Sequence, residues 1–545
     1  SILKYYNICY PESKSGQFGF LELEDPQGTA DLLQRVYYEE LLNDKSHNQT
    51  DYGDAFLRQS VPAGCNIHMY YGRTKGHGHM DKMNFEIIAN KLNCTPDLGY
   101  PEHAEQFPKR YEWTSHTISH NTVTVNESAQ NQTECAGNPL GFEDDEIVKY
   151  IEVDDPSVYD QTDVYHRAVC MIETSSGKAY FVDLFRVSGG DTHEISFHGG
   201  EGTVDINGVD LVSQSKGTLQ GEDVAFGERK ERKSVMFDYA LGRGNGYHYL
   251  YDVQKSENTV DHTELTYRLT DTWSQRVGLK GQPYLKAIFL TETHRTVIAK
   301  GEPPVNKIGN PPYLYYYLGK RKGSNLKSNF VSVYEPYIDQ SDIQSVEKVP
   351  FLGMEDEFVA VCVKVLLTDG TTDYLFHSTD DNMELRTSNG LAFKGRLGFV
   401  RFKGDKVLHA FMSNAVHIKV NQHVILNSKT PCIKGQVTDL QRLSDPMNFI
   451  ELQLNEDNMQ KSVESLKGKY IYIDGDQPGN ACFEIRDIKP VANGSFRIMI
   501  DETPIRGYKN GINRKDGFIY RFNEGAAFSI PLSNSFDSTF EGSLT

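Results

Sequence analysis

One segment near the start of the chain has the apolar periodicity of a helix. Across residues 27–44, apolar side chains recur at steps of three and four residues at Leu33, Val36, Tyr37 and Leu41, while acidic residues fall on the other faces. This spacing predicts an amphipathic helix. Almost nothing later in the chain shows the same periodicity.

From about residue 56 the chain changes to short apolar runs with a period close to two, as half-buried antiparallel strands require. The clearest runs before residue 200 are 66–72, 85–89, 147–153, 167–173, 179–187 and 193–198. Turn dipeptides such as Ser176-Gly177 and Asp369-Gly370 separate neighbouring runs, which indicates hairpins rather than crossover helices. The pattern predicts a mainly β fold of stacked antiparallel sheets and argues against a βαβ fold.

A new series of apolar runs begins after about residue 420. Its members are 424–426, 449–454, 470–473, 483–485, 496–501 and 518–522. We therefore predict three parts: a short helical segment and linker over 1–55, a large antiparallel β-sandwich over 56–420, and a smaller C-terminal β domain over 421–545.

Composition and charge narrow the function classes. The 545 residues include 56 Lys and Arg against 75 Asp and Glu, so the net charge is −19, which argues against a nucleic-acid partner. Any anionic ligand must therefore meet a local basic cluster. No run approaches the roughly 18 apolar residues of a membrane span, so no membrane partner is expected. The chain starts at Ser1 without an initiator Met or a signal-peptide core, which indicates a piece of a longer protein.

Chemistry-bearing residues concentrate between residues 76 and 123. Residues 76–82 read Gly-His-Gly-His-Met-Asp-Lys, and Asp97 and His120 follow in short polar segments. On an extended backbone, His77 and His79 would lie on one face about 7 Å apart. That separation suits two ligands of one metal, or one ligand beside one catalytic group. A His, Asp and His set fits zinc with an open fourth position, whereas the alternative is a group of surface or hydrogen-bonded loop histidines.

Three motifs in this region resemble those of a known family. The sequence His-Gly-His-Met-Asp-Lys at 77–82 is followed by Asp-Leu-Gly at 97–99 and by His-Asn-Thr-Val at 120–123. In this order they resemble the C-terminal half of heparinase II/III-like polysaccharide lyases, which include alginate lyases with an N-terminal (α/α) toroid. The resemblance covers roughly residues 30–420 and implies a sheet domain that carries part of a lyase active site.

The resemblance implies roles for individual residues in these motifs. His79, Asp97 and His120 match the ligands of the family's metal, usually zinc, which we interpret as chiefly structural; a Lewis-acid metal is the alternative. His77 matches the histidine that faces the sugar and assists proton abstraction. Apart from the resemblance, local positive charge near the site is available from Arg73, Lys75, Lys82, Lys109 and Arg110.

Some members of the family place a base Tyr between the second and third motifs. The candidates here are Tyr100 and Tyr111, of which we favour Tyr111 as catalytic; the alternative is that both pack on a sheet. Lys109 and Arg110 are candidates for binding uronate carboxylates, although such a pair also suits a solvated loop. Trp113 is a candidate for stacking on a sugar ring, with a core position as its alternative.

The resemblance implies a carbon–oxygen lyase that cleaves an acidic polysaccharide, alginate first, by β-elimination. Alternatives are a glycosaminoglycan lyase of heparin or chondroitin type, a uronyl C5-epimerase, and a noncatalytic carbohydrate-binding β-sandwich with a structural metal. The family's toroid supplies further catalytic groups and does not fit into this chain. Residues 1–55 are then its last part, and the remainder lies upstream or in a separate chain. The resemblance also implies a secreted or cell-surface bacterial protein.

Overall fold

Antiparallel β-structure makes up almost all of the regular structure in the part of the chain that the structure describes. The computed structural model describes residues 45–538, with gaps at 60, 62–63, 77, 102–108, 229–244, 277, 306–308, 442–447, 455–465, 476–477, 492–494, 501 and 509–516. Helical turns within these residues are η1 (Arg110–Thr114), η2 (Thr117–Ser119), η3 (Pro156–Val158) and η4 (Tyr247–Tyr249). None of the described helices is long and apolar enough to cross a membrane. The predicted mainly β class is confirmed, and the helix predicted over 27–44 lies outside the described residues.

An eight-stranded antiparallel sheet forms the central layer. Its strands, in spatial order, are β12 (Gly202–Asn207), β15 (Thr263–Leu269), β16 (Pro283–Phe289), β19 (Lys327–Ile338), β10 (Ala179–Ser188), β9 (Val164–Glu173), β8 (Val148–Asp154) and β7 (Asn138–Asp144). Every residue of β10 is buried, because other sheets cover both of its faces. The expected alternation of buried and exposed positions therefore fails in the middle of this sheet, although strands such as β2 (Asp54–Arg58) follow it.

Two smaller sheets pack on one face of the central layer. The first is β1 (His47–Gln49), β2, β3 (Asn66–Tyr70), β4 (Asn84–Ala89) and β5 (Leu92–Asn93). The second is β13 (Val212–Ser213), β14 (Leu250–Lys255), β17 (Arg295–Gly301), β18 (Leu314–Lys322), β11 (Thr192–His198) and β6 (Val123–Val125). One apolar core joins them to the central sheet, with Ile67, Phe197 and Phe181 as representatives of the three layers. The candidate site lies where these two smaller sheets meet.

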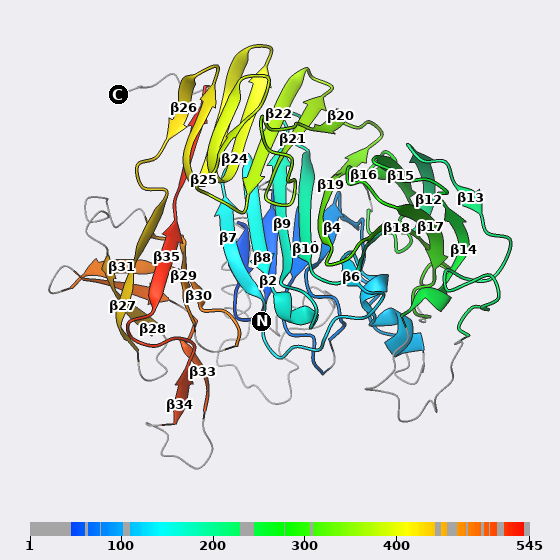
Figure 1. The fold of residues 1–545 in the computed structure, drawn as a ribbon, viewed down its shortest axis with the longest axis horizontal. Helices are drawn as coiled ribbons and strands as arrows, with labels where there is room; N and C mark the ends of the chain where they lie inside the picture. Colours follow the sequence, from blue (N-terminus) through cyan, green and yellow to red (C-terminus); the bar gives the residue numbers. More distant parts are fainter. Residues whose placement is uncertain are drawn as a thin grey trace.

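A further sheet covers the opposite face of the central layer (Figure 1). Its path is β20 (Ile343–Lys348), β21 (Ala360–Leu367), β22 (Thr371–Ser378), β24 (Leu391–Lys403), β25 (Lys406–Val420) and β26 (His423–Asn427), with β23 (Glu384–Arg386) and β36 (Ser533–Asp537) paired to β24 and β25. Val182 of the central sheet and Val363 of this one belong to the shared core. The predicted stacking of antiparallel sheets is thereby confirmed.

The remaining strands form a seven-stranded sheet and a separate hairpin. The sheet contains β30 (Cys482–Glu484), β29 (Tyr470–Ile473), β35 (Ala527–Pro531), β27 (Cys432–Leu440), β28 (Asn448–Leu454), β32 (Phe496–Ile500) and β31 (Asp487–Pro490), and the hairpin pairs β33 (Ile505–Tyr508) with β34 (Phe518–Tyr520). This sheet has its own apolar core, which includes Ile450 and Phe483. The hairpin β25–β26 spans residue 420, and the predicted division of the chain at that position stays a prediction.

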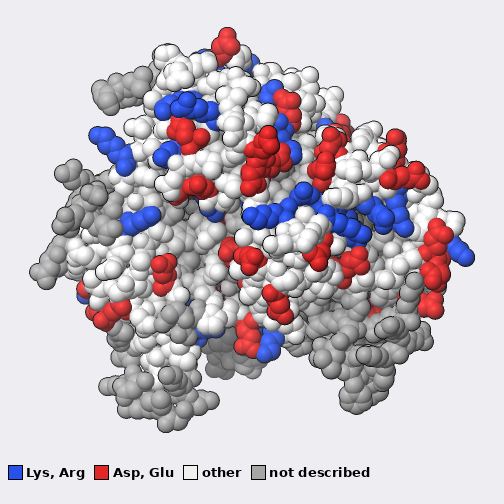
Figure 2. Space-filling view, viewed as in Figure 1, with Lys and Arg blue, Asp and Glu red and all other residues white. Residues whose placement is uncertain are grey.

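Charged side chains of both signs share the surface. Figure 2 shows acidic and basic residues interspersed on one face, with Lys and Arg side chains gathered into a band to the right of its centre. The excess of acidic residues therefore does not produce a uniformly negative surface. An anionic ligand can be met by local groups of cations, as the composition requires.

Candidate functional site

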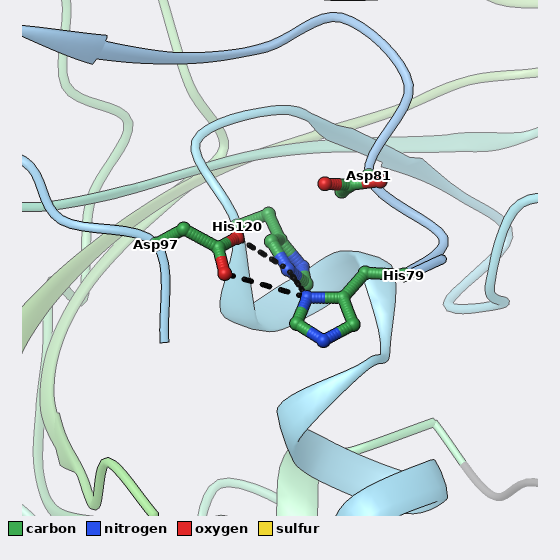
Figure 3. A group of neighbouring side chains, drawn as sticks. All are labelled: His79, Asp81, Asp97 and His120. Carbon is green, nitrogen blue, oxygen red and sulfur yellow. Dashed lines mark hydrogen bonds and ion pairs between the residues drawn. The ribbon is translucent and has the colours of Figure 1, made fainter. Parts of the chain in front are cut away.

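Three separate segments bring the predicted metal ligands together (Figure 3). His79 lies in the loop between β3 and β4, Asp97 follows β5, and His120 follows η2 directly, in the short segment that leads to β6. The hairpin β4–β5 turns at Asn90 and Lys91, whose φ angles of 53° and 64° are those of a tight two-residue hairpin turn. This hairpin places Asp97 beside the other two segments.

The ligand atoms of these residues lie at distances suited to one metal ion. His79 Nδ1 is 3.5 Å from Asp97 Oδ1, His120 Nε2 is 3.1 Å from Asp97 Oδ2, and the two ring nitrogens are 3.0 Å apart. Metal–ligand bonds of 2.0–2.1 Å in a tetrahedron place ligand atoms about 3.3 Å apart. Asp81 also has a carboxylate oxygen within 4.8 Å of the other three ligand atoms. Sequence reasoning missed Asp81, although it lies two residues after His79 in the same motif.

The hydrogen bonds around the cluster favour a bound cation. His120 Nδ1 lies 2.9 Å from the backbone oxygen of His116, which suits the tautomer with the proton on Nδ1 and the lone pair of Nε2 toward the cluster. Asp97 Oδ1 accepts a hydrogen bond from the backbone N–H of Gly99 at 2.7 Å. Oδ1 of Asp81 is buried without a hydrogen-bond partner in the described structure. A cation would satisfy the lone pairs that converge here, so the residues present fit a metal.

The electrostatics of the cluster agree with its ligand chemistry. Burial by itself would raise the pKa of Asp97, but His120 and His79 hold that pKa well below its usual range. Burial would lower the pKa of His120, yet the Asp97 carboxylate raises it. Burial raises the pKa of Asp81. Asp97 is therefore the carboxylate that stays ionised and ready to bind a cation.

One buried arginine connects the loops that carry these ligands. Arg167 on β9 donates through Nη1 to the backbone oxygens of Met83 at 2.5 Å and Asn121 at 2.6 Å. Its other nitrogens bind both carboxylate oxygens of Asp183 on β10 at 2.8 and 2.7 Å. Met83 ends the loop of the first motif, and Asn121 follows His120 directly. The central sheet therefore fixes two of the three loops through one side chain.

The candidate catalytic residues differ in how the structure places them. His77 lies outside the described residues. Tyr111 is half-buried in η1, where the Arg110 guanidinium lies 5.3 Å from its ring centre. Tyr100 is 46% exposed, stacks on the ring of His79 at 5.5 Å, and has the same guanidinium 4.6 Å from its ring centre. Of the two tyrosines considered, Tyr100 is the one in contact with the cluster, and both roles stay predictions.

Two expectations about substrate contacts need correction. Trp113 is 0% exposed and its indole N–H donates to the backbone oxygen of Glu302, so it occupies the core position that was its alternative and cannot stack on a sugar. Lys82 is also fully buried and binds Asp155 at 2.5 Å, so its charge does not reach a substrate. Lys109 stays partly exposed and pairs with the Glu302 carboxylate at 2.6 Å.

A second buried group of possible ligands lies between the central sheet and the sheet that contains β22. His166, His377 and Glu152 place ligand atoms within 4.8 Å of one another. Arg396 binds the Glu152 carboxylate through two nitrogens, one of them at 2.9 Å, and holds its pKa well below the usual range against the effect of burial. Because cationic Arg396 already binds this carboxylate, we interpret the group as a polar junction between sheets. Sequence reasoning did not identify this group, because its three members lie in separate strands and share no sequence motif.

Comparison with known proteins identifies a family for part of the chain. Residues 68–207 match the model of the heparinase II/III-like C-terminal family, and this segment contains His79, Asp97 and His120. No curated protein matches the chain.

Several solved structures are similar to part of this chain. A heparinase III gene product is 13% identical with a TM-score of 0.41 over 61% of this chain and 42% of its own. A crystal structure of heparinase III is 14% identical with a TM-score of 0.37 over 62% and 43%. A heparan sulfate lyase from Pedobacter heparinus is 14% identical with a TM-score of 0.37 over 62% and 45%. The chain thus spans less than half the length of each of these proteins.

Proposed function

We propose that this chain, which carries a heparinase II/III-like C-terminal domain, is the sheet portion of a polysaccharide lyase that cleaves a uronic-acid polymer by β-elimination. The observation that supports this proposal is the convergence of the buried His79 and His120 with the half-buried Asp97 inside the family-matching segment. His77 precedes His79 by two residues, so a cluster that fixes this loop also restrains the proposed catalytic histidine.

The reaction needs a base, an acid and a means to stabilise charge. A base removes the proton at C5, the electron pair forms the C4–C5 double bond, and the bond from C4 to the glycosidic oxygen breaks while an acid protonates that oxygen. We propose His77 as the base, because an imidazole with a pKa near 6.5 is largely neutral at pH 7. Arg110, whose guanidinium lies over Tyr100 beside the cluster, would stabilise the negative charge that develops on the uronate carboxylate.

Two tyrosines are candidates for the second proton-transfer group. Tyr111 is the candidate favoured from the sequence, although neither tyrosine stands at the family's usual interval, whereas the stacking of Tyr100 on His79 supports Tyr100. We propose to decide between them by comparing Tyr100→Phe with Tyr111→Phe, since each change removes one hydroxyl and keeps the ring. The variant that loses product formation without losing substrate binding identifies the group.

We also propose that His79, Asp97 and His120 hold a zinc ion. Bound there, zinc would supply fixed positive charge that ties three loops together. The surrounding residues would orient the site: His116 through its contact with His120, and Arg167 through the loop backbones. Removal of the metal is then expected to loosen the loop of the first motif.

The polymer and the cellular setting are further parts of the proposal. The description of the matching family supports a glycosaminoglycan as the substrate ahead of alginate, which the sequence reasoning had placed first. The toroid groups of the family would come from upstream sequence or from another chain. Secretion or surface display in a bacterium is proposed because an enzyme placed there reaches an extracellular polymer directly.

Near-ultraviolet absorbance tests the proposed activity, because elimination creates a conjugated unsaturated uronate. The zinc-loaded chain, supplied with the toroid portion, is incubated with heparan sulfate and, separately, with alginate, and absorbance is followed over time. We expect His77→Ala to abolish the signal while zinc content and melting temperature stay near wild type. His423→Ala, at an exposed position of β26, is the matched control and should keep full activity.

Several outcomes would contradict the proposal. Retained activity in His77→Ala would remove that residue from the reaction. Absence of absorbance with every uronate polymer would argue against lyase activity of this chain, and inverted sugar stereochemistry without absorbance would indicate an epimerase instead.

A further inference from the structure

Aromatic and cationic side chains continue from η1 away from the metal cluster. The ammonium of Lys109 lies 5.4 Å from the ring centre of Phe226, which is 41% exposed. The Phe226 ring in turn meets Tyr251 edge to face at 5.4 Å. An exposed phenylalanine held between a lysine and a tyrosine leaves part of an apolar face open to a ligand.

Three neighbouring strands extend this surface. Tyr251 on β14 is the register partner of Lys300 on β17, and Lys300 is the partner of Tyr315 on β18. Register partners in antiparallel strands project to the same face, and two strand spacings span about 10 Å. The Lys300 ammonium lies 4.3 Å from the ring centre of Tyr313, which meets Tyr315 edge to face at 5.5 Å. We call Phe226, Tyr251, Lys300, Tyr313 and Tyr315 the distal strip.

The distal strip is continuous with the candidate site. Lys109 and Arg110 are consecutive residues: Lys109 contacts Phe226, and Arg110 contacts Tyr100, which stacks on His79. Figure 1 shows the helical turn η1 close to η4, from which β14 leads into the sheet at the right of the view. A polymer lying over Tyr100 can therefore reach the distal strip without leaving the protein surface.

We propose that the distal strip binds saccharide units of an anionic polysaccharide several units away from the bond that is cleaved. This inference rests on the proposed function and specifies the length of substrate that the site prefers. Aromatic rings present flat apolar faces to the C–H faces of sugars, and Lys300 meets a carboxylate or sulfate group. A strip about 10 Å long accommodates about two sugar units.

The charges of the strip fit a polyanion despite the net charge of −19. Lys300 pairs with Asp252 at 2.9 Å, but Asp252 has a side chain that is 61% exposed. Exposed ion pairs contribute little stability, so the anionic group of a sugar can replace Asp252 as the partner of Lys300. The aromatic rings beside Lys300 keep the ammonium at the surface of the strip.

Titration calorimetry with oligosaccharides of defined length tests the inference. Heparan sulfate and alginate fragments of four and ten sugars are titrated into the whole chain. We expect Lys300→Ala and Tyr313→Ala each to weaken binding of the ten-sugar fragment by about five-fold and to leave the four-sugar fragment unchanged. Lys300→Ala should also reduce the salt dependence of binding, whereas Tyr313→Ala should not.

The control is Lys327→Ala, which removes a lysine that lies over Phe358 on another part of the surface. It should bind both fragments like wild type. Equal loss for both lengths, wild-type affinity in both strip variants, or no binding of either ten-sugar fragment to the wild type would overturn the inference. Product formation with unchanged binding in Lys300→Ala would refute the strip and leave the lyase proposal standing. Length-dependent binding without product formation would support the strip and refute the lyase proposal.

Discussion

Replacing Asp183 by Asn is expected to destabilise the protein strongly. The Asp183 carboxylate is 0% exposed and compensates the charge of Arg167, whose side chain is 1% exposed. The substitution keeps the shape of the side chain and removes its charge. Arg167 would retain its hydrogen bonds to the backbone oxygens of Met83 and Asn121 but lose the ionic partner on β10.

The magnitude follows from the burial of the pair. Loss of one partner from a buried ion pair costs roughly 3–5 kcal/mol, because the remaining charge stays in a medium that solvates it poorly. In the double variant Arg167→Met with Asp183→Leu both charges are gone, and the main loss is two backbone oxygens without donors, about 1–3 kcal/mol each at most. The double variant should therefore be less destabilised than the sum of its single changes, and it should still bind zinc more weakly than wild type.

Urea unfolding followed by tryptophan fluorescence measures the stability of each variant. Trp113 lies in the core near the site, whereas Trp273 is 39% exposed, so a Trp273→Phe background isolates the buried reporter. Zinc affinity is measured by competition with a chelator in the same background. A loss below about 1 kcal/mol in Asp183→Asn would refute the reasoning from burial. Wild-type zinc affinity in the double variant would show that Arg167 does not position the loops.

Other outcomes follow from single residues. His120→Ala should lower both bound zinc and the melting temperature, measured by elemental analysis and calorimetry, and a wild-type zinc content would contradict the ligand assignment. Lys82→Met leaves the Asp155 carboxylate without its buried partner and should cost roughly 3–5 kcal/mol by urea unfolding. Burial lowers the pKa of His377 to about 3 and that of His193 to about 4, so both stay neutral in the folded protein while the unfolded chain takes up protons below about pH 6.5. Stability should therefore fall as the pH drops from about 6.5 toward 4, by about 2 kcal/mol per histidine at pH 5, and equal stability at pH 7 and pH 5 would contradict this.

Much of the strand pattern could be predicted because local sequence determines it. The alternation in 66–72 depends on neighbouring residues alone, and it occurs as expected in β3. The layering could not be predicted in this way. Ser188 pairs with Lys327, so β10 and β19 become neighbours only through a long-range contact that leaves no local signal. The continuous burial of β10 is a consequence of that layering.

The candidate site shows the same division between local and long-range information. The motif residues His79 and His120 converge as the resemblance implied, since each motif specifies its own loop. The burial of Trp113 depends on packing against Tyr316, which lies far along the chain. Asp81 lies within the first motif, but the three-ligand pattern of a metal site is complete without it, so the sequence alone does not single it out.

Strand pairing makes the family-matching segment dependent on the rest of the chain. Residues 68–207 contain β10 and β11, but their partners β19 and β18 lie beyond residue 313. A protein cut after residue 207 would open one edge of each strand, because eight positions of β10 lose their pairs with β19 and seven of β11 lose theirs with β18. Such open edges invite aggregation. The recognisable signature is therefore not a transferable module. Transfer of this site to another protein, by evolution or by engineering, must therefore include the partner strands β18 and β19.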